Sequence, residues 1–460
     1  MRSLARFLLL AIATRVAVPQ NLSFASREAR PVPDWLPKVT IYEIWLNAFS
    51  SDGNLRGAIA RLPRVAELGA SVVYLGPIAR RSSLPHASPY SIADYNAIDP
   101  ECGSEEDLRD FVSAAHKLKL KVMLDIVYYH AAPDSTLLKN PDSFVKTPDG
   151  QIARGFWPQP LPDFRNPEVR RYLIDSLVHW VRDFQIDGYR CDVGGGVPIT
   201  FWEEARKELD RVNSNVILLS ESDRPDDQLR AFDINYNFQY YLTLRSVLRD
   251  GAPAIALREN WEKTKSTMPR GARLLHYSDN HDWSRAVLEF GEKGAVAASI
   301  LNFTLDGIPF LYNGQEIGDP TETQWRRRAP IQWPDADKHR RDTEALTLLE
   351  EYRTLFRMRS TYSAFTSGNL IWINNTEPES ALSFLRKKGN DEILVILNLS
   401  NRKIHVTVDL PVMDYYSVEN LLEGGETSFQ LYSGRVSGDL GAFDAVVAKK
   451  IPLAPLAEPK

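Results

Sequence analysis

Two charged residues stand two positions apart in the apolar segment IDGYRCDVGGG, which covers residues 186–196. If this segment is a strand, Arg190 and Asp192 project from the same face, because side chains in a strand alternate with period two. Three glycines follow at once, so we expect the strand to end there and open into a loop. Taken alone, Asp192 could instead cap the next helix or simply pair with Arg190.

Further acids and histidines stand near the ends of other apolar segments. Each acid by itself could be a turn residue or a strand end at solvent. Three of the acids, Asp192, Glu221 and Asp282, together with a buried arginine suit glycoside hydrolysis, in which one carboxylate attacks and another serves as acid and then base. The residues are Asp125 and His130 in segment 121–130, Glu221 in segment 215–222, and His281 and Asp282 in segment 273–282.

Strand-like and helix-like segments alternate from residue 39 to about residue 360. Helical runs include 104–120, with a capping box of Ser104 and Asp107, and 166–184, which opens with Asn and then Pro. The alternation predicts parallel strands joined by right-handed crossovers, in a closed eight-stranded β/α (TIM) barrel whose mouth gathers the polar strand ends. A doubly wound open sheet is the alternative. The eight strand-like segments begin at residues 39, 71, 121, 186, 215, 231, 273 and 307.

The pattern changes after about residue 363, where short alternating strands are separated by Gly, Asn and Asp. This change predicts a C-terminal all-β sandwich over residues 363–460. The barrel is then expected over residues 26–362. Residues 131–164 are expected to form a short inserted subdomain after its third strand.

The N-terminal residues carry Arg2 and Arg6, then an apolar run over 7–13 and small residues near 23–26. This order predicts a secretory signal peptide over residues 1–25, and hence a secreted or periplasmic protein; a ragged helix is the alternative. The net charge of −5 gives no reason to expect nucleic acid or a membrane surface as partner. The two cysteines cannot form a disulfide framework.

Several segments, taken in order, resemble the alpha-amylase family of glycoside hydrolases and transglycosidases. The longest is PYSIADYNAIDPECGSEEDLRDFVSAAHKLKLKVMLDIVYYH; YEIWLNAF precedes it, and DGYRCD, SE at 220–221, NHD at 280–282 and GIPFLYNGQEIG follow. The resemblance implies a retaining hydrolase that cleaves α-glucosidic bonds in starch-derived or related oligosaccharides. A transglycosidase using the same residues, or a non-catalytic amylase-like binding module, are the alternatives.

The same resemblance assigns roles to the acids. It implies that Asp192 is the nucleophile, Glu221 the general acid/base and Asp282 the stabiliser of the transition state. Arg190 should favour ionised Asp192, whereas Glu221 needs a raised pKa in order to begin protonated. Sugar contacts are implied for Tyr90, His130, Arg190 and His281, and a supporting position for Asp125.

Three features depart from the family's pattern. Tyr129 stands where the family usually has an Asn that is often a calcium ligand, so we expect no metal at this site and no cofactor. The residues after Asp192 are VGGG, which offer no Lys or His to the leaving-group side. In the short insertion, Phe156 and Trp157 could line the cleft or fill a core.

Overall fold

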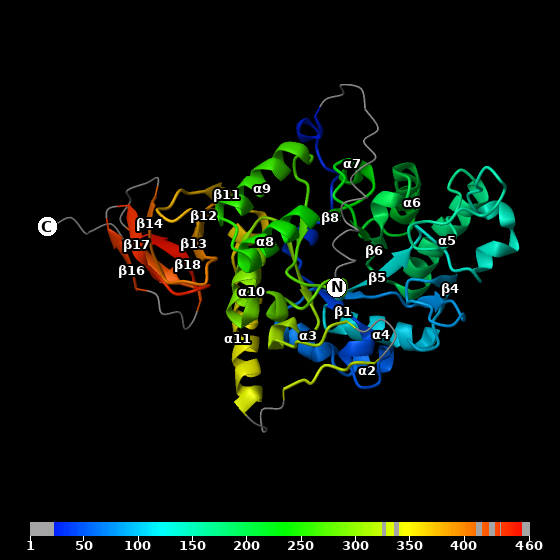
Figure 1. Cartoon of the computed structure of the whole chain (residues 1–460), viewed down its shortest axis with the longest axis horizontal. Coiled ribbons are helices and arrows are strands. Elements are labelled where there is room, and N and C mark those ends of the chain that lie inside the picture. The colour runs from blue at the N-terminus through cyan, green and yellow to red at the C-terminus, as the bar shows by residue number, and fades with distance from the viewer. Residues whose placement is uncertain are drawn as a thin grey trace.

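The computed structural model describes residues 23–323, 328–334, 340–410, 416–422, 428–432 and 434–452. Residues 1–22 of the expected signal peptide lie outside them. The centre of the molecule is a closed barrel of eight parallel strands (Figure 1). The strands are β1 (Ile41–Ile44), β2 (Val72–Leu75), β5 (Lys121–Val127), β6 (Gly188–Asp192), β7 (Ile217–Ser220), β8 (Ile234–Tyr236), β9 (Leu274–His276) and β10 (Ile308–Tyr312).

The barrel closes because β1 pairs in parallel with both β2 and β10. Each of the eight expected strand segments contributes one barrel strand, so the predicted TIM barrel is confirmed and the open doubly wound sheet is wrong. Parallel strands direct all their carboxyl ends to one mouth. The loops that leave those ends therefore carry the candidate residues.

Helices surround the barrel, and their starts follow the expected capping. Ser104 and Asp107 form the capping box of α4, and the Asn166 side chain caps α5. The amphipathic pattern of residues 55–68 indicates one helix, but the segment forms two, because Pro63 cannot supply a helical N–H and stands in the first turn of α3. The main helices are α2 (Leu55–Ile59), α3 (Leu62–Leu68), α4 (Glu105–Lys117), α5 (Pro167–Phe184), α6 (Ile199–Val212), α8 (Phe238–Asp250), α9 (Ile255–Thr267), α10 (Ala286–Thr304) and α11 (Arg340–Thr361).

Two excursions rise from the barrel between β2 and α5. An antiparallel pair of β3 (Ala79–Arg81) and β4 (Ile92–Ile98), which the sequence pattern did not indicate, precedes α4. After β5 the chain forms two short 3-10 turns and an irregular hairpin, with isolated bridges such as Phe144 to Pro162 and Arg154 to Pro160. This hairpin falls within the expected insertion, whose limits of 131–164 stay a prediction.

The C-terminal strands form two antiparallel sheets, so the expected all-β architecture is confirmed. One sheet has the order β11-β12-β13-β18-β15 and the other β14-β17-β16. The larger sheet contacts α10 and α12 (Ser363–Ser367), at the left of the barrel in Figure 1. The boundary at 362/363, between α11 and α12, stays a prediction. The strands are β11 (Asn369–Trp372), β12 (Ala381–Lys388), β13 (Asp391–Asn398), β14 (Ile404–Asp409), β15 (Tyr416–Asn420), β16 (Ser428–Tyr432), β17 (Arg435–Leu440) and β18 (Ala445–Pro452).

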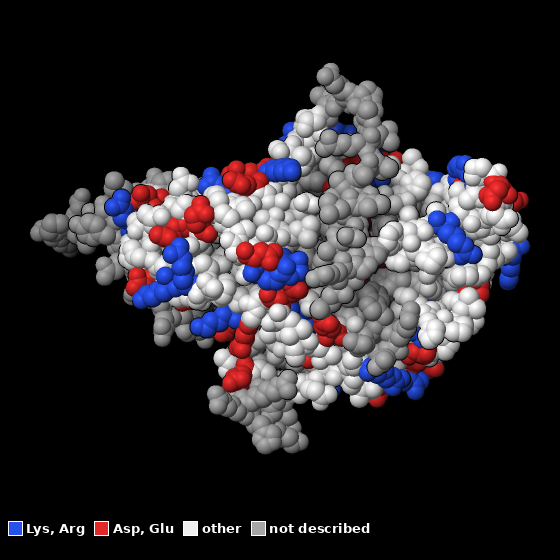
Figure 2. All heavy atoms as spheres, viewed as in Figure 1, with Lys and Arg blue, Asp and Glu red and all other residues white. Residues whose placement is uncertain are grey.

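Acidic and basic side chains are interspersed in small groups on the face drawn in Figure 2. Within the described part of the chain, no helix has both the length and the apolar character needed to cross a membrane.

Candidate active site

The strand register brings the first group of candidate residues together. Asp125 on β5 is the direct neighbour of Arg190 on β6, and Val127 is the neighbour of Asp192. The backbone N–H of Glu221, just beyond β7, donates to the carbonyl of Cys191. Asp125, Asp192 and Glu221 thus lie around one position at the carboxyl mouth of the barrel.

Arg190 lies at the centre of this group, and its side chain is fully buried. Nη1 donates to Asp125 Oδ1 at 2.9 Å and to Asp192 Oδ1 at 2.8 Å. Nη2 lies 2.9 Å from Glu221 Oε1. One guanidinium therefore joins the two carboxyl groups that the resemblance names as nucleophile and acid/base.

Burial shifts the pKa of both of these acids. It raises the pKa of the Asp192 carboxyl well above its ordinary value, and Arg190 opposes this shift without overcoming it. Burial likewise raises the pKa of Glu221, with Arg190 again acting in the opposite direction. Since both acids contact the same guanidinium, their protons are released in steps that belong to the pair.

Asp125 is held by phenolic hydroxyls as well as by Arg190. Tyr74 donates to its Oδ2 at 2.6 Å, and Tyr90 donates to the same oxygen at 2.8 Å. Because its oxygens are committed to Arg190 and to these hydroxyls, Asp125 suits the supporting position expected for it. Tyr74 was not singled out in the sequence, since an isolated Tyr in an apolar strand looks like a core residue.

His281 and Asp282 come from the loop after β9 and form a second group. His281 Nε2 lies 2.7 Å from the Tyr90 hydroxyl and 3.2 Å from Asp282 Oδ2, and Nδ1 lies 2.5 Å from Glu43 Oε1. The His281 ring stacks on Trp45, with ring centroids 5.3 Å apart and planes 6° apart. Tyr90 thereby links this group to Asp125 and Arg190.

The pKa values of the two residues in this second group shift in opposite directions. Burial alone would lower the pKa of His281, but Asp282 and Glu43 raise it well above its ordinary value. Burial opposes ionisation of Asp282, yet His281 holds the pKa of that carboxyl below its ordinary value. Of Asp192, Glu221 and Asp282, Asp282 is therefore the acid that ionises most readily, and its side chain is 35% exposed to solvent.

Glu43 is a residue that the sequence reasoning missed. It lies inside β1 in the segment YEIWLNAF, and its side chain is fully buried. The signal that could have found it is the one that singled out Arg190, namely a charged residue within an otherwise apolar strand.

His130 lies beside the inserted hairpin, in a different electrostatic setting. Its ring centroid is 5.5 Å from that of Trp157, which also packs edge-on against Tyr129. Burial lowers the pKa of His130 to about 4, so this ring is neutral at pH 7. Trp157 and Phe156 are 44% and 56% exposed, which is incompatible with the alternative that they fill a core.

The segment VGGG is shaped by close packing. Val193 has φ 44° and ψ 43°, a left-handed conformation that is costly for a β-branched residue. In this conformation its backbone N–H donates to Glu221 Oε2 at 2.6 Å. A Cβ added at Gly194 would lie 2.6 Å from Ser220 Oγ, and one at Gly196 would lie 2.6 Å from the Tyr129 ring. The glycines therefore let the loops after β5, β6 and β7 approach one another.

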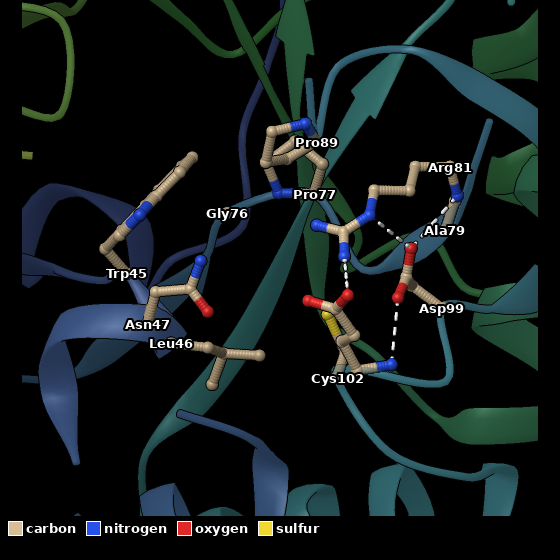
Figure 3. Close-up of a pocket in the computed structure, with 11 residues that line it drawn as sticks. Trp45, Leu46, Asn47, Gly76, Pro77, Ala79, Arg81, Pro89, Asp99 and Cys102 are labelled. Carbon is tan, nitrogen blue, oxygen red and sulfur yellow. Dashed lines mark hydrogen bonds and ion pairs between the residues drawn. The ribbon is translucent and has the colours of Figure 1, made fainter. Parts of the chain in front are cut away.

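A separate pocket opens next to Trp45, lined by residues that follow β1, β2 and β4 (Figure 3). Its charged groups are paired: Arg81 contacts both Asp99 and Glu101. Cys102 is a free thiol, and burial raises its pKa to about 12, so it is not a nucleophile at neutral pH. Cys191 is also free and is buried. The pocket adds no reactive group to the mouth.

A closed β/α barrel with carboxylates and a buried arginine at its carboxyl mouth is an arrangement suited to a barrel glycoside hydrolase. The family model "Alpha amylase, catalytic domain" matches residues 23–149 and 154–392, which make up most of the chain. The chain belongs to the alpha-amylase family.

Known proteins of this family resemble the chain over most of its length. The alpha-amylase MalA of Haloarcula japonica is 28% identical, and the match covers 94% of this chain but only 63% of MalA. Neopullulanase 2 of Thermoactinomyces vulgaris is 28% identical, with 84% of this chain and 73% of that protein covered.

Solved structures agree with the observed fold. A maltogenic alpha-amylase, AmyB of Thermotoga neapolitana, matches with a TM-score of 0.81 at 28% identity, covering 91% of this chain and 100% of AmyB. The alpha-amylase of Geobacillus thermoleovorans, solved in complex with acarbose, matches with a TM-score of 0.78 at 25% identity; 91% of this chain and 99% of that one are covered.

We expect no calcium ion to bind at the position beside Tyr129, so removal of calcium should not affect the protein through this position. The aromatic ring fills the space against Gly155 and Gly196, and a phenol is a poor ligand for a hard cation. Dialysis against a chelator should leave the melting temperature and the rate of glucoside cleavage unchanged. A loss of either that added calcium restores would contradict this prediction.

Proposed function

We propose that this protein is a retaining hydrolase of α-glucosidic bonds in starch-derived or related α-gluco-oligosaccharides. The observation that carries the proposal is the contact of one buried guanidinium, that of Arg190, with both Asp192 and Glu221. Retaining enzymes need their two carboxyl groups about 5–5.5 Å apart, a spacing that a single side chain can bridge. Inverting enzymes need a wider gap, because a water molecule must fit between the sugar and the carboxylate that acts as general base.

In the proposed mechanism Asp192 attacks the anomeric carbon while protonated Glu221 gives its proton to the leaving oxygen. The raised pKa of Glu221 supports its role as general acid. Arg190 favours the ionised form of Asp192 when the Asp192–Glu221 pair loses its first proton. Glu221, now ionised, then takes a proton from the water that cleaves the glycosyl-enzyme. Asp282, whose pKa is lowered, supplies negative charge near the cationic transition state.

A transglycosidase would use the same residues and differ only in whether water or a sugar reaches the intermediate. The curated relatives include proteins named cyclomaltodextrinase and neopullulanase as well as alpha-amylase. A non-catalytic binding module is the weaker alternative, because such a module has no need of three carboxylates held at one mouth with shifted pKa values.

Export of the protein is also a proposal, and it rests on the N-terminal residues 1–25 alone. Two relatives that are 28% identical are named intracellular maltogenic amylases of Bacillus subtilis. If the segment is a signal peptide, the intact mass of protein recovered from its native host should lack about 25 residues. Recovery of the full-length mass from the cell interior would overturn this proposal.

Glu221→Gln is expected to separate the acid from the nucleophile. The variant cannot protonate a leaving oxygen, so natural oligosaccharides should lose about 10²–10⁴-fold in rate. A glycosyl fluoride needs no such proton and should still form the intermediate on Asp192. Wild-type activity on oligosaccharides should also fall as the pH rises and Glu221 loses its proton, whereas this fall should be absent in the variant acting on the fluoride.

Added azide supplies the matched control. Azide can attack the glycosyl-enzyme without a general base, so Glu221→Gln should be partly rescued and should give an azide product of retained configuration. Asp192→Asn should show no such rescue, because no glycosyl-enzyme forms. Equal behaviour of the two variants with the fluoride, or an inverted azide product from Glu221→Gln, would show that the roles of the two acids are wrong.

Trp157 and Phe156 are expected to bind the part of the substrate beyond the scissile bond. Trp157 packs against His130 and Tyr129 and presents an exposed ring to which the apolar face of a sugar can bind. Trp157→Ala should raise KM for maltooligosaccharides about tenfold and leave that for 4-nitrophenyl α-glucoside nearly unchanged. Leu84→Ala, which also removes an exposed apolar side chain, is the control. An equal effect on both substrates would contradict this assignment.

A further inference from the structure

Glu43 is a carboxylate buried in the barrel wall, and the proposed mechanism gives it no part. Its side chain has no exposed surface, and a buried carboxylate is costly unless it is paired. Oε1 lies 2.5 Å from His281 Nδ1, whereas Oε2 has no hydrogen-bond partner among the described residues. The one ring nitrogen of His281 is therefore the principal partner of this carboxylate.

The hydrogen-bond chain on the other side of His281 fixes the direction of donation. Asp125 also accepts from Arg190 and Tyr74, and the Tyr90 hydroxyl donates its only hydrogen to the same carboxyl group. Tyr90 must then accept from His281, which means that Nε2 carries a hydrogen. The same nitrogen, Nε2, lies 3.2 Å from Asp282 Oδ2.

With a hydrogen on Nε2, the protonation of the other ring nitrogen, Nδ1, depends on the protonation of Glu43. If Glu43 is ionised, Nδ1 must also carry a hydrogen, and the ring is an imidazolium. If Glu43 is protonated, its hydroxyl donates to Nδ1 of a neutral ring. In both cases the Glu43–His281 pair holds one proton more than an ionised acid beside a neutral imidazole would hold.

We propose that Glu43 is a positioning residue of the glycosidase inferred above: it retains this extra proton beside Asp282 and fixes the ring of His281. The proposal rests on the proposed function only for its catalytic consequence. The ring is also held by its stack on Trp45, so its plane does not depend on Glu43 alone. What Glu43 adds is a second acidic group, on the side of the ring opposite to Asp282, that keeps the extra proton on the pair.

The groups that face the pair come from several elements. Glu43 is on β1, Arg190 on β6, Tyr90 precedes β4, and Asp282 follows His281 in the loop after β9. Two carboxylates on opposite sides of His281 favour its cationic form, and this cation in turn favours ionised Asp282. Loss of the proton would leave Asp282 without its nearest positive charge.

Glu43→Gln tests the proposal with almost no change in shape. The amide can accept from Nδ1–H or, after rotation, donate to Nδ1, so the ring keeps its position in either protonation state. The amide has no charge, so the His281 titration, followed by NMR of its ring nitrogens, should move to lower pH. The kcat/KM for 4-nitrophenyl α-glucoside should match the wild type in acid and fall about tenfold or more as the pH rises through that titration.

Glu316→Gln is the matched control. Glu316 is also a buried carboxyl whose pKa burial raises, and it accepts a hydrogen bond from the hydroxyl of Tyr42, the residue before Glu43. This variant should alter stability only. The His281 titration and the pH profile of kcat/KM should be the same as in the wild type. Glu43→Leu, checked for folding by circular dichroism, should repeat the titration shift and in addition lower kcat at every pH.

The proposal is overturned if the His281 signals titrate alike in the wild type and Glu43→Gln, or if Glu316→Gln shifts them equally. Because the NMR titration needs no turnover, it decides on Glu43 even if the protein fails to cleave glucosides. A wild-type protein without glycosidase activity would instead count against the proposed function. A shifted titration with an unchanged pH profile would overturn the catalytic part of the proposal.

Discussion

The mouth of this barrel depends on one buried cation. Arg190 has no exposed surface. It contacts Asp192 on its own strand, Asp125 on the neighbouring strand β5 and Glu221 just beyond the other neighbour, β7. Removing one partner from a buried ion pair typically costs about 3–5 kcal/mol, because the remaining charge is left uncompensated. The positions of β5, β6 and β7 and the protonation of the two proposed catalytic acids are therefore coupled through a single guanidinium.

The charges around this mouth do not balance if every acid is ionised. Five carboxyl groups face two cationic side chains, Arg190 and His281, so protons must be retained at neutral pH. Burial is the main cause of the raised pKa values of Glu43, Asp192 and Glu221, and the neighbouring carboxyl groups raise them further. The five carboxyl groups are Glu43, Asp125, Asp192, Glu221 and Asp282. A neutral sugar meets this field without penalty, while a cationic transition state is stabilised by it.

Most of the barrel could be predicted from the sequence, because hydrophobic runs and capping residues are local signals. The Ser104 capping box, the Asn166 cap and the order of the eight strands needed no tertiary information. The β3–β4 pair and the break at Pro63 were missed. Their strand and helix patterns are too short for periodicity to distinguish them from a loop or from a longer helix.

The sequence by itself determined that Asp125, Asp192 and Glu221 meet at one mouth, since parallel strands place all their carboxyl ends at one side of a barrel, but it did not single out Glu43 or Tyr74. It did not determine which acid holds a proton. That depends on distances across the barrel, such as those from Arg190 to Glu221 and from His281 to Glu43, between residues far apart in the chain. The exposure of Trp157 and the left-handed backbone of Val193 were likewise decided only by tertiary packing. Electrostatic energies in a dry interior change steeply with separation, and separation is what the closed barrel fixes.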